Sequence, residues 1–129
     1  DKIDWTPYKG FVYTFDETKD IAWLYLVSDM LITDYSSVMF DYSILNRPML
    51  FFAYDLEDYK ENLRGFYFDF VNDIPGPISR DTDQLIKDIK EYNEDSWKEK
   101  YKNYHDKFNG IDDGHASQKV IDVIKKVSR

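Results

Sequence analysis

Short apolar runs alternate with amphipathic segments along the first 80 residues. The apolar runs are rich in β-branched and aromatic side chains, so strands are expected at residues 11–15, 30–33, 49–53 and 78–79. Helical spacing of apolar side chains predicts helices between these runs, at residues 16–28, 36–47 and 56–63. The run Met49–Ala53 is apolar throughout, which is typical of a parallel strand covered on both faces.

The remainder of the chain is helical in pattern. Asp81 or Thr82 can cap a first helix. The residues of this helix expected to face inward are Leu85, Ile86 and Ile89. An aromatic stripe follows at helical spacing and is expected to lie in the core. Its members are Trp97, Tyr101, Tyr104 and Phe108. A final amphipathic helix is expected over residues 116–127, and its apolar stripe consists of Val120, Ile121, Ile124 and Val127.

The alternation of buried strands and helices predicts an α/β domain, with a Rossmann-like parallel sheet and flanking helices. A chain of 129 residues has room for a single domain. Three or four strands are few for such a sheet, and the sequence starts at Asp1 without a signal-peptide pattern. We therefore expect residues 1–129 to be one partial domain of a longer polypeptide, whose upstream part supplies further strands.

Composition narrows the possible functions. Hydrophobic residues make up 43% of the chain and aromatic residues 18%, which is enough for a packed core despite a net charge of -8. A chain with a pI near 4.7 lacks the basic surface that nucleic-acid binding needs. The absence of cysteine excludes disulfides and thiolate metal sites, and it fits a cytoplasmic protein. No apolar run approaches the ~20 residues that span a membrane.

The run LITDYSSVMFDY, at residues 31–42, carries the clearest candidate chemistry. It has the pattern of a buried strand, a polar turn and the start of a helix, and ligands of parallel sheets bind beyond the carboxyl ends of strands. Ser36 and Ser37 offer hydroxyl groups and free backbone N–H groups at a helix start, which suits a phosphate or pyrophosphate. Either serine can instead serve as a helix N-cap, and the two roles are compatible.

Acidic and hydroxyl side chains flank this turn. Asp41 lies one helical turn after Ser37 and can accept hydrogen bonds from sugar hydroxyls, although an exposed helix acid is equally expected there. Thr33 and Asp34 can shape the turn, and Asp34 is given only this role because its carboxylate repels phosphate. Tyr35 can cover a ligand or pack on the surface. These residues together predict a site for a nucleotide-diphosphate donor.

Further candidates follow the next expected strand. Asp55 lies at the end of that strand, so it either faces the ligand edge of the sheet or caps a helix. Arg64, with Gly65, precedes an aromatic run, and an arginine can pair with phosphate through its planar guanidinium group. A salt bridge from Arg64 to a nearby acid is the alternative.

The two histidines are weaker candidates. His105 lies in a charged helix and is expected to be a solvated surface residue. His115 follows Asp112, Asp113 and Gly114, and we interpret this segment as a turn with a helix cap, because a hard-cation site needs more oxygen ligands. No pair of carboxylates stands out as an acid–base couple, and we predict neither a metal nor a cofactor.

Several longer stretches of the sequence occur in a distinctive order. They are SDMLITDYSSVMFDYSILNRPMLFFAYDLEDYKENLRGFYFDF, then PGPI, then FNGIDDGHAS before the last helix. The ordered set LITDYSS, FDY, RPM, YD and RGFYFDF is much more specific than a lone glycine motif. Over about residues 20–127 the chain resembles the C-terminal nucleotide-binding half of CDP-glycerol glycerophosphotransferases, the enzymes of wall teichoic acid synthesis.

The resemblance implies the donor-binding half of a two-domain, GT-B glycosyltransferase-like enzyme. It implies transfer of glycerol phosphate from CDP-glycerol, or of ribitol phosphate from CDP-ribitol, to a lipid-linked primer or polymer at the cytoplasmic face of the cell membrane. The polyprenyl-diphosphate-linked acceptor would bind the missing N-terminal half.

The resemblance also concerns the catalytic residue. The family's catalytic histidine, in a Lys-Pro-His-type segment, has no match in residues 1–10, so we expect it upstream and expect this fragment to be inactive. The candidate substrate-binding residues are Thr33, Tyr35, Ser36, Ser37, Asp41, Asp55, Arg64 and Gly65.

Two other functions stay open at this point. A nucleotide-sugar-dependent GT-B glycosyltransferase domain would prefer UDP-sugars to CDP-glycerol. A non-catalytic α/β interaction module would bind Mg²⁺ or a protein through its acidic turn residues, without any effect of nucleotide.

Overall fold

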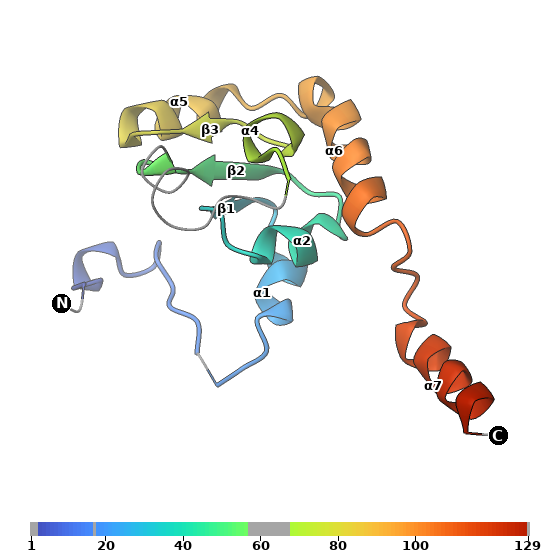
Figure 1. Cartoon of the computed structure of the whole chain (residues 1–129). Coiled ribbons are helices and arrows are strands. Elements are labelled where there is room, and N and C mark those ends of the chain that lie inside the picture. Colours follow the sequence, from blue (N-terminus) through green and yellow to red (C-terminus); the bar gives the residue numbers. More distant parts are fainter. Residues whose placement is uncertain (1–2, 17, 57–67, 129) are drawn as a thin grey trace.

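A parallel three-stranded sheet lies at the centre of the computed structural model, which describes residues 3–16, 18–56 and 68–128 (Figure 1). The strand order is β1 (Leu31–Thr33), β2 (Met49–Phe52) and β3 (Ile78–Ser79). Leu31 pairs with Met49, and Phe51 pairs with Ile78. The predicted α/β class with a parallel sheet is therefore confirmed.

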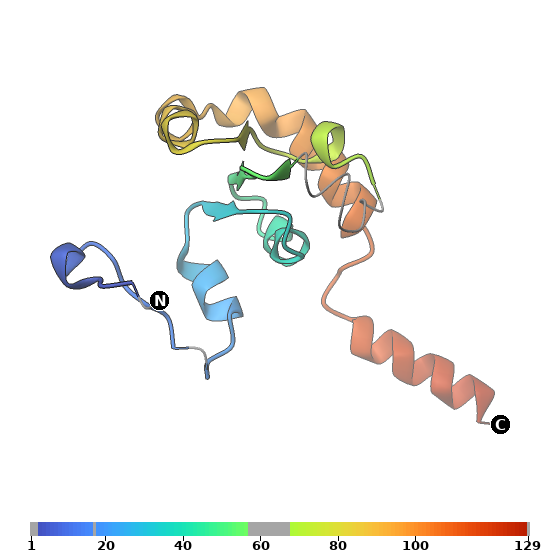
Figure 2. The same cartoon turned by 60° about the vertical axis from the view of Figure 1, so that its left-hand side comes forward.

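Helices surround this sheet. Those within the described residues are η1 (Thr6–Tyr8), α1 (Ala22–Val27), α2 (Val38–Ser43), α4 (Phe70–Asp73), α5 (Thr82–Glu91), α6 (Glu94–Phe108) and α7 (Ala116–Val127). Helix α5 contacts β3 and β2, α2 contacts β1, and α6 contacts α2 and α4. Helix α7 projects away from all of them (Figures 1 and 2). None of the described helices is long and apolar enough to cross a membrane.

The central strand β2 is the most deeply buried element. Met49, Leu50 and Phe51 are completely inaccessible to solvent, as expected for a strand covered on both faces. Gly76 passes directly against this strand, because a Cβ atom there would lie 1.9 Å from the Met49 carbonyl oxygen. The Pro-Gly-Pro turn therefore brings β3 alongside β2 only with glycine at its centre.

The aromatic stripe of α6 packs into the core, as predicted. Tyr101 and Tyr104 are buried, and Trp97 and Phe108 are half-buried. The Tyr104 ring stacks on Phe40 of α2 with centroids 5.9 Å apart, and it contacts Phe108 at 4.7 Å. Burial of large rings is a main source of core stability, so this stripe attaches α6 to the sheet.

Arg47 joins α1 to the sheet. Its guanidinium group donates hydrogen bonds to the carbonyl oxygens of Tyr25, Leu26 and Ser28, at 3.2, 2.9 and 2.7 Å. These carbonyls lie at the C-terminal end of α1, where they lack helical partners and carry partial negative charge. The sequence alone did not reveal this role, which explains the arginine of the RPM motif in structural terms.

Asn109 joins the end of α6 to α2. Its side chain is buried, accepts a hydrogen bond from the Ser43 hydroxyl at 2.5 Å and donates one to the Phe40 carbonyl oxygen at 3.1 Å. The hydrogen bonds of both polar atoms of this buried amide offset the cost of its desolvation. The asparagine of the FNGIDDGHAS stretch therefore has a structural role.

The N-terminal elements differ from the prediction. Residues 11–15 form no strand: apart from a bridge between Lys9 and Val12 this segment is irregular, and Phe11 is 86% exposed. The Asp16 carboxylate accepts hydrogen bonds from the N–H and hydroxyl of Thr18, which closes a local turn instead of starting a helix. Helix α1 starts only at Ala22. The aromatic pattern of residues 11–15 has no neighbouring strand in the described residues to pair with.

The predicted helices after β1 and β3 are confirmed with adjusted ends. Helix α2 ends at Ser43, earlier than predicted, and Asn46 then adopts a left-handed conformation with φ of 52°. The Asp81 carboxylate caps α5 by accepting the Gln84 N–H at 2.8 Å, as predicted. The helix expected at residues 56–63 lies almost wholly outside the described residues.

Two predicted apolar faces are not buried. In α5, Leu85 is half-buried, but Ile86 and Ile89 are exposed, because this short sheet does not extend beneath the whole helix. In α7 the predicted stripe is exposed along its length. The periodicity identified both helices correctly. Burial of their apolar faces would need a neighbouring surface to cover them, and the described residues do not provide one.

Candidate functional site

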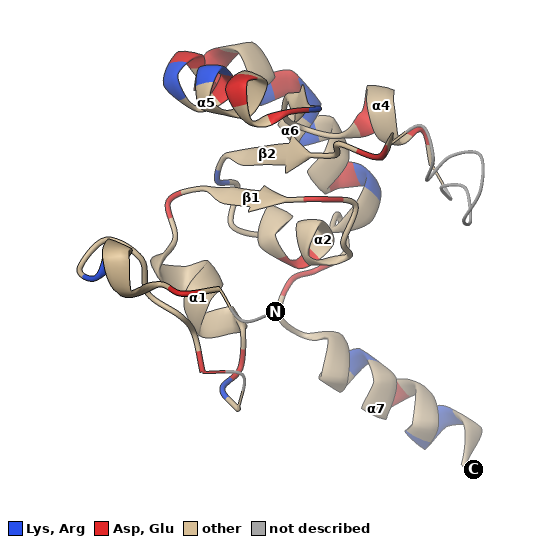
Figure 3. Ribbon diagram, turned by 90° about the vertical axis from the view of Figure 1, so that its left-hand side faces the viewer, with Lys and Arg blue, Asp and Glu red and all other residues tan. Residues whose placement is uncertain are grey.

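The predicted site residues gather at the carboxyl edge of the sheet. Thr33 ends β1, residues 34–37 form the turn to α2, and Asp55 follows β2. A hollow of about 380 Å³ lies at this edge, lined by Ile32, Thr33, Asp34, Phe52 and Tyr54. Acidic residues mark the turn after β1 and the exposed side of α2 (Figure 3). This is the edge where parallel sheets bind their ligands.

Asp34 builds the turn, as predicted. Its carboxylate accepts a hydrogen bond from the Ser36 N–H at 2.8 Å, which folds the chain back toward α2. Ser37 is the N-cap residue of α2, yet its side chain makes no capping hydrogen bond. Within the described residues, the hydroxyls of Ser36 and Ser37 and the Ser37 N–H have no hydrogen-bond partner. These donors remain available to a ligand.

Tyr35 and Asp55 come together across the edge. The Tyr35 hydroxyl donates a hydrogen bond to the Asp55 carboxylate, and both side chains are half-buried. The Tyr35 ring also meets Phe70 edge-on, with centroids 6.1 Å apart. This pair links the turn after β1 to the segment after β2, so it fixes the width of the edge.

Asp41 is exposed on α2, one turn beyond Ser37. Its charge contributes to raising the pKa of Tyr25 in α1, after the larger effect of burial of that phenol. The Asp41 carboxylate accepts no hydrogen bond from the described residues, and the side chain is exposed to solvent. Arg64 and Gly65, the other two candidates, lie outside the described residues.

The segment before α7 is a turn, as we interpreted it, but the N-cap residue His115 makes no capping hydrogen bond with its side chain. The Asp113 carboxylate accepts the His115 N–H at 2.9 Å and forms an ion pair with Lys119 at 2.9 Å. The hydrogen bonds from Lys119 and His115 lower the pKa of Asp113. Asp113 is therefore engaged in the local structure of this turn.

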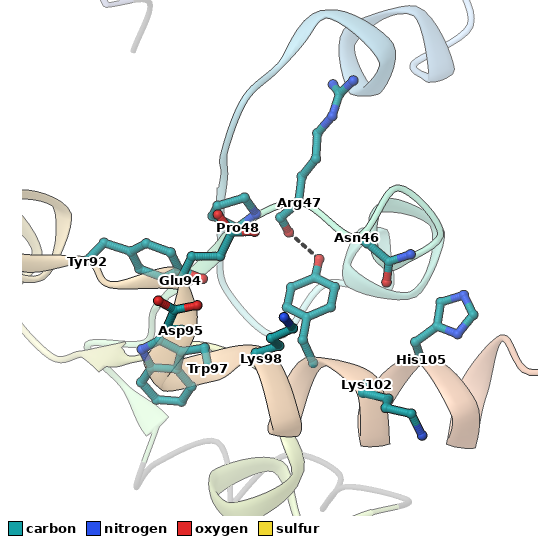
Figure 4. A pocket seen from close by; sticks show the side chains of 11 residues that line it. Asn46, Arg47, Pro48, Tyr92, Glu94, Asp95, Trp97, Lys98, Lys102 and His105 are labelled. Carbon is teal, nitrogen blue, oxygen red and sulfur yellow. Dashed lines mark hydrogen bonds between the residues drawn. The ribbon is translucent and has the colours of Figure 1, made fainter.

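A second cavity, which the sequence analysis did not predict, lies at the amino edge of the sheet. It has a volume of about 430 Å³ and lies between α6 and the segment before β2 (Figure 4). His105 lines it and is half-buried, which corrects the prediction of a solvated surface histidine. The reason is that Asn46 and Pro48 lie opposite the face of α6 that carries His105. Helical spacing puts Lys98, Lys102 and His105 on one face of α6, but no local pattern shows what lies opposite that face.

The fold and this edge define a class. The parallel α/β sheet with its flanking helices matches the GT-B-like glycosyltransferase class in solved structures. The wall teichoic acid polymerase TagF, including a variant soaked with CDPG, matches 96% of this chain with a TM-score of 0.84 and 44% sequence identity. The chain covers 31% of that polymerase.

The sequence comparison identifies the family. The model of the family CDP-Glycerol:Poly(glycerophosphate) glycerophosphotransferase matches residues 1–126, and the chain belongs to this family. The teichoic acid poly(glycerol phosphate) polymerase of Bacillus subtilis is 44% identical over 98% of this chain. The teichoic acid poly(ribitol-phosphate) polymerase of Bacillus spizizenii is 44% identical over 91% of it. The chain spans 17% and 18% of the lengths of these two relatives.

Proposed function

We propose that this chain supplies the CDP-alditol site of a teichoic acid glycerophosphotransferase. The observation that carries the proposal is the turn between β1 and α2, where Ser36 and Ser37 keep free donors at the carboxyl edge of a sheet shared with TagF. Family membership points to CDP-glycerol, and the ribitol-phosphate relatives make CDP-ribitol the other donor of the same chemistry.

The serine turn is the proposed pyrophosphate contact. The two hydroxyls and the Ser37 N–H can donate to phosphate oxygens, and such charge-assisted hydrogen bonds are stronger than neutral ones. Helix α2 has only six residues, so these local donors contribute more than its small macrodipole. Thr33 lines the hollow and would add a further hydroxyl.

Acidic residues are the proposed sugar contacts. The exposed carboxylate of Asp41 would accept hydrogen bonds from the ribose hydroxyls, one helical turn away from the phosphates. The Tyr35–Asp55 pair would border the ligand and hold the two sides of the site at a fixed separation. Arg64 with Gly65 stays a candidate for a second phosphate contact.

The proposed reaction is transfer of an alditol phosphate. The acceptor hydroxyl transfers its proton to a general base outside these 129 residues and attacks the β-phosphorus of the donor. The bond to the bridging oxygen breaks, and CMP leaves with that electron pair. The turn would stabilise the charge on the leaving phosphate by fixed donors, without an obligatory metal. We infer that the catalytic histidine and the lipid-linked acceptor site lie outside these 129 residues, at the cytoplasmic face of the membrane, and that the chain alone binds the donor without turnover.

Titration of the ¹⁵N-labelled chain with CMP, CDP-glycerol and UDP-glucose tests the proposal. Shift changes should centre on Ser36, Ser37 and Asp41, with the cytidine ligands preferred. The double change Ser36→Ala and Ser37→Ala should weaken CDP-glycerol binding at least tenfold, because two charge-assisted hydrogen bonds are lost. Ser96→Ala, in the first turn of α6, is the matched control and should bind as the unchanged chain does.

Two results would contradict the proposal. A preference for UDP-glucose would favour a nucleotide-sugar glycosyltransferase domain. Equal CDP-glycerol affinity in the double serine variant would show that the turn does not bind the pyrophosphate.

A further inference from the structure

The cavity at the amino edge of the sheet has the features of a binding site. Its volume of about 430 Å³ exceeds that of the hollow at the carboxyl edge. Pro48 lines it and directly precedes β2, whereas the proposed donor site lies beyond the other end of that strand. The completely buried residues of β2 lie between the two places, so the cavity and the hollow are separate.

One wall of the cavity is fixed by the core. The Tyr101 hydroxyl donates a hydrogen bond to the Arg47 carbonyl oxygen, which ties α6 to the segment before β2 (Figure 4). The Arg47 side chain points away from the cavity toward α1, where its guanidinium group is occupied by carbonyl oxygens. The cavity is therefore held open by rigid structure, which reduces the entropic cost of binding.

The lining has a cationic part and an aromatic, acidic part. Lys98, Lys102 and His105 follow one another at intervals of four and three residues, so they share one face of α6. Lys98 forms no ion pair within the described residues, and Lys102 bonds Asp106 at 2.9 Å with one of its three ammonium donors. The other part is lined by Tyr92, Glu94, Asp95 and Trp97 (Figure 4).

We propose that this cavity binds an alditol phosphate unit of a polymeric chain. The lysines would hold a phosphate. Glu94 and Asp95 would accept hydrogen bonds from alditol hydroxyls, and Asn46 could accept or donate them. The ring of Trp97 would cover the carbon backbone of the alditol. This inference rests on the proposed function and adds a subsite for polymer units, distinct from the donor turn and from the site outside these 129 residues that binds the lipid-linked end. A chain with a net charge of -8 attracts no polyanion by its overall field, so the cationic lining has to act locally.

Trp97 provides the readout. In a Trp5→Phe and Trp23→Phe background, whose two positions are exposed, Trp97 is the remaining tryptophan. A synthetic glycerol phosphate oligomer should change its fluorescence in a saturable manner, and inorganic phosphate should bind much more weakly. CDP-glycerol should leave the Trp97 signal unchanged, which separates the polymer from the nucleotide as the source of the alditol phosphate.

Variants make the test decisive. Lys98→Gln with Lys102→Gln should weaken oligomer binding about tenfold or more. Lys125→Gln with Lys126→Gln, on α7, is the matched control and should have no effect. Ser36→Ala with Ser37→Ala should also leave oligomer binding unchanged. A failure of the donor proposal can therefore be told apart from a failure of this one. No saturable signal, a response to CDP-glycerol alone, or full binding by the Lys98/Lys102 variant would overturn the proposal.

Discussion

Helices α6 and α7 follow each other in the chain and each carries an apolar stripe at helical spacing, but only α6 is integrated into the core. Its aromatic stripe packs on α2 and α4, and Tyr104 is 1% exposed. The stripe of α7 faces solvent, and Ile124 is 57% exposed. Amphipathic periodicity thus predicts a helix and the face it can bury, but burial itself depends on the surface available to that face.

The largest expected effect comes from truncating the α6 stripe. Tyr104→Ala should lower the free energy of unfolding by about 3–5 kcal/mol, because a large ring is lost from contacts with Phe40 and Phe108. Ile124→Ala in α7 should change it by less than about 0.5 kcal/mol. Urea denaturation followed by circular dichroism measures both. A cost of 2 kcal/mol or more for Ile124→Ala, by the same scale, would show that α7 is buried in solution and would end the contrast.

A companion variant separates ring packing from the hydroxyl. The Tyr104 hydroxyl is buried without a hydrogen-bond partner in the described part of the chain, and burial raises its pKa. Tyr104→Phe keeps the ring and removes that unpaired group, so stability should stay the same or rise. A loss above about 1 kcal/mol would instead show that the hydroxyl has a partner, such as a bound water.

A smaller effect is expected where α6 ends. Asn109→Ala removes the hydrogen bonds to Ser43 and Phe40 and leaves buried polar groups unpaired, so it should cost about 1–3 kcal/mol. Asn103→Ala, at an exposed position of the same helix, is the matched control and should cost less than about 0.5 kcal/mol. Alanine has a higher helix propensity than asparagine, so equal losses in the two variants would mean that the link to α2 does not set the cost.

The sequence predicted the elements of the core because local pattern and burial agree there. The run at Met49–Ala53 and the aromatic stripe of α6 each have one stable arrangement, and the structure confirms both. Residues 11–15 have the pattern of a strand without a partner strand in the described chain, and local hydrogen bonds of Asp16 decide the structure that follows. Strand formation depends on neighbours that a local pattern does not contain.

The candidate site was predicted in position but not in detail. The pattern placed Thr33, Ser36 and Asp55 at one edge, since carboxyl ends of parallel strands share an edge. The Tyr35–Asp55 hydrogen bond joins residues 20 positions apart, and no local pattern reveals such a contact. The roles of Arg47 and Asn109 were missed for the same reason, because both depend on tertiary contacts.

The smallest expected effect concerns ion pairs beside the two helices. Lys119 and the His115 N–H lower the pKa of Asp113, and Lys102 lowers the pKa of Asp106 within α6. A carboxyl whose pKa is lower in the folded than in the unfolded state adds stability that is present above its ordinary pKa, near 3.8, and is lost as the pH falls through the folded value. Each pair is exposed, so its contribution is small.

Carboxyl NMR titrations of two lysine variants resolve this effect. Lys119→Ala should raise the pKa of Asp113 toward 3.8 and leave Asp106 unchanged, whereas Lys102→Ala should do the reverse. Each lysine pairs with its own carboxyl, so the pKa values of Asp113 and Asp106 should respond independently, although α6 is packed in the core and α7 is not. A shift of Asp106 in Lys119→Ala would require the two helices to lie closer in solution than the structure has them, and the contrast between a docked and a projecting helix would then fail.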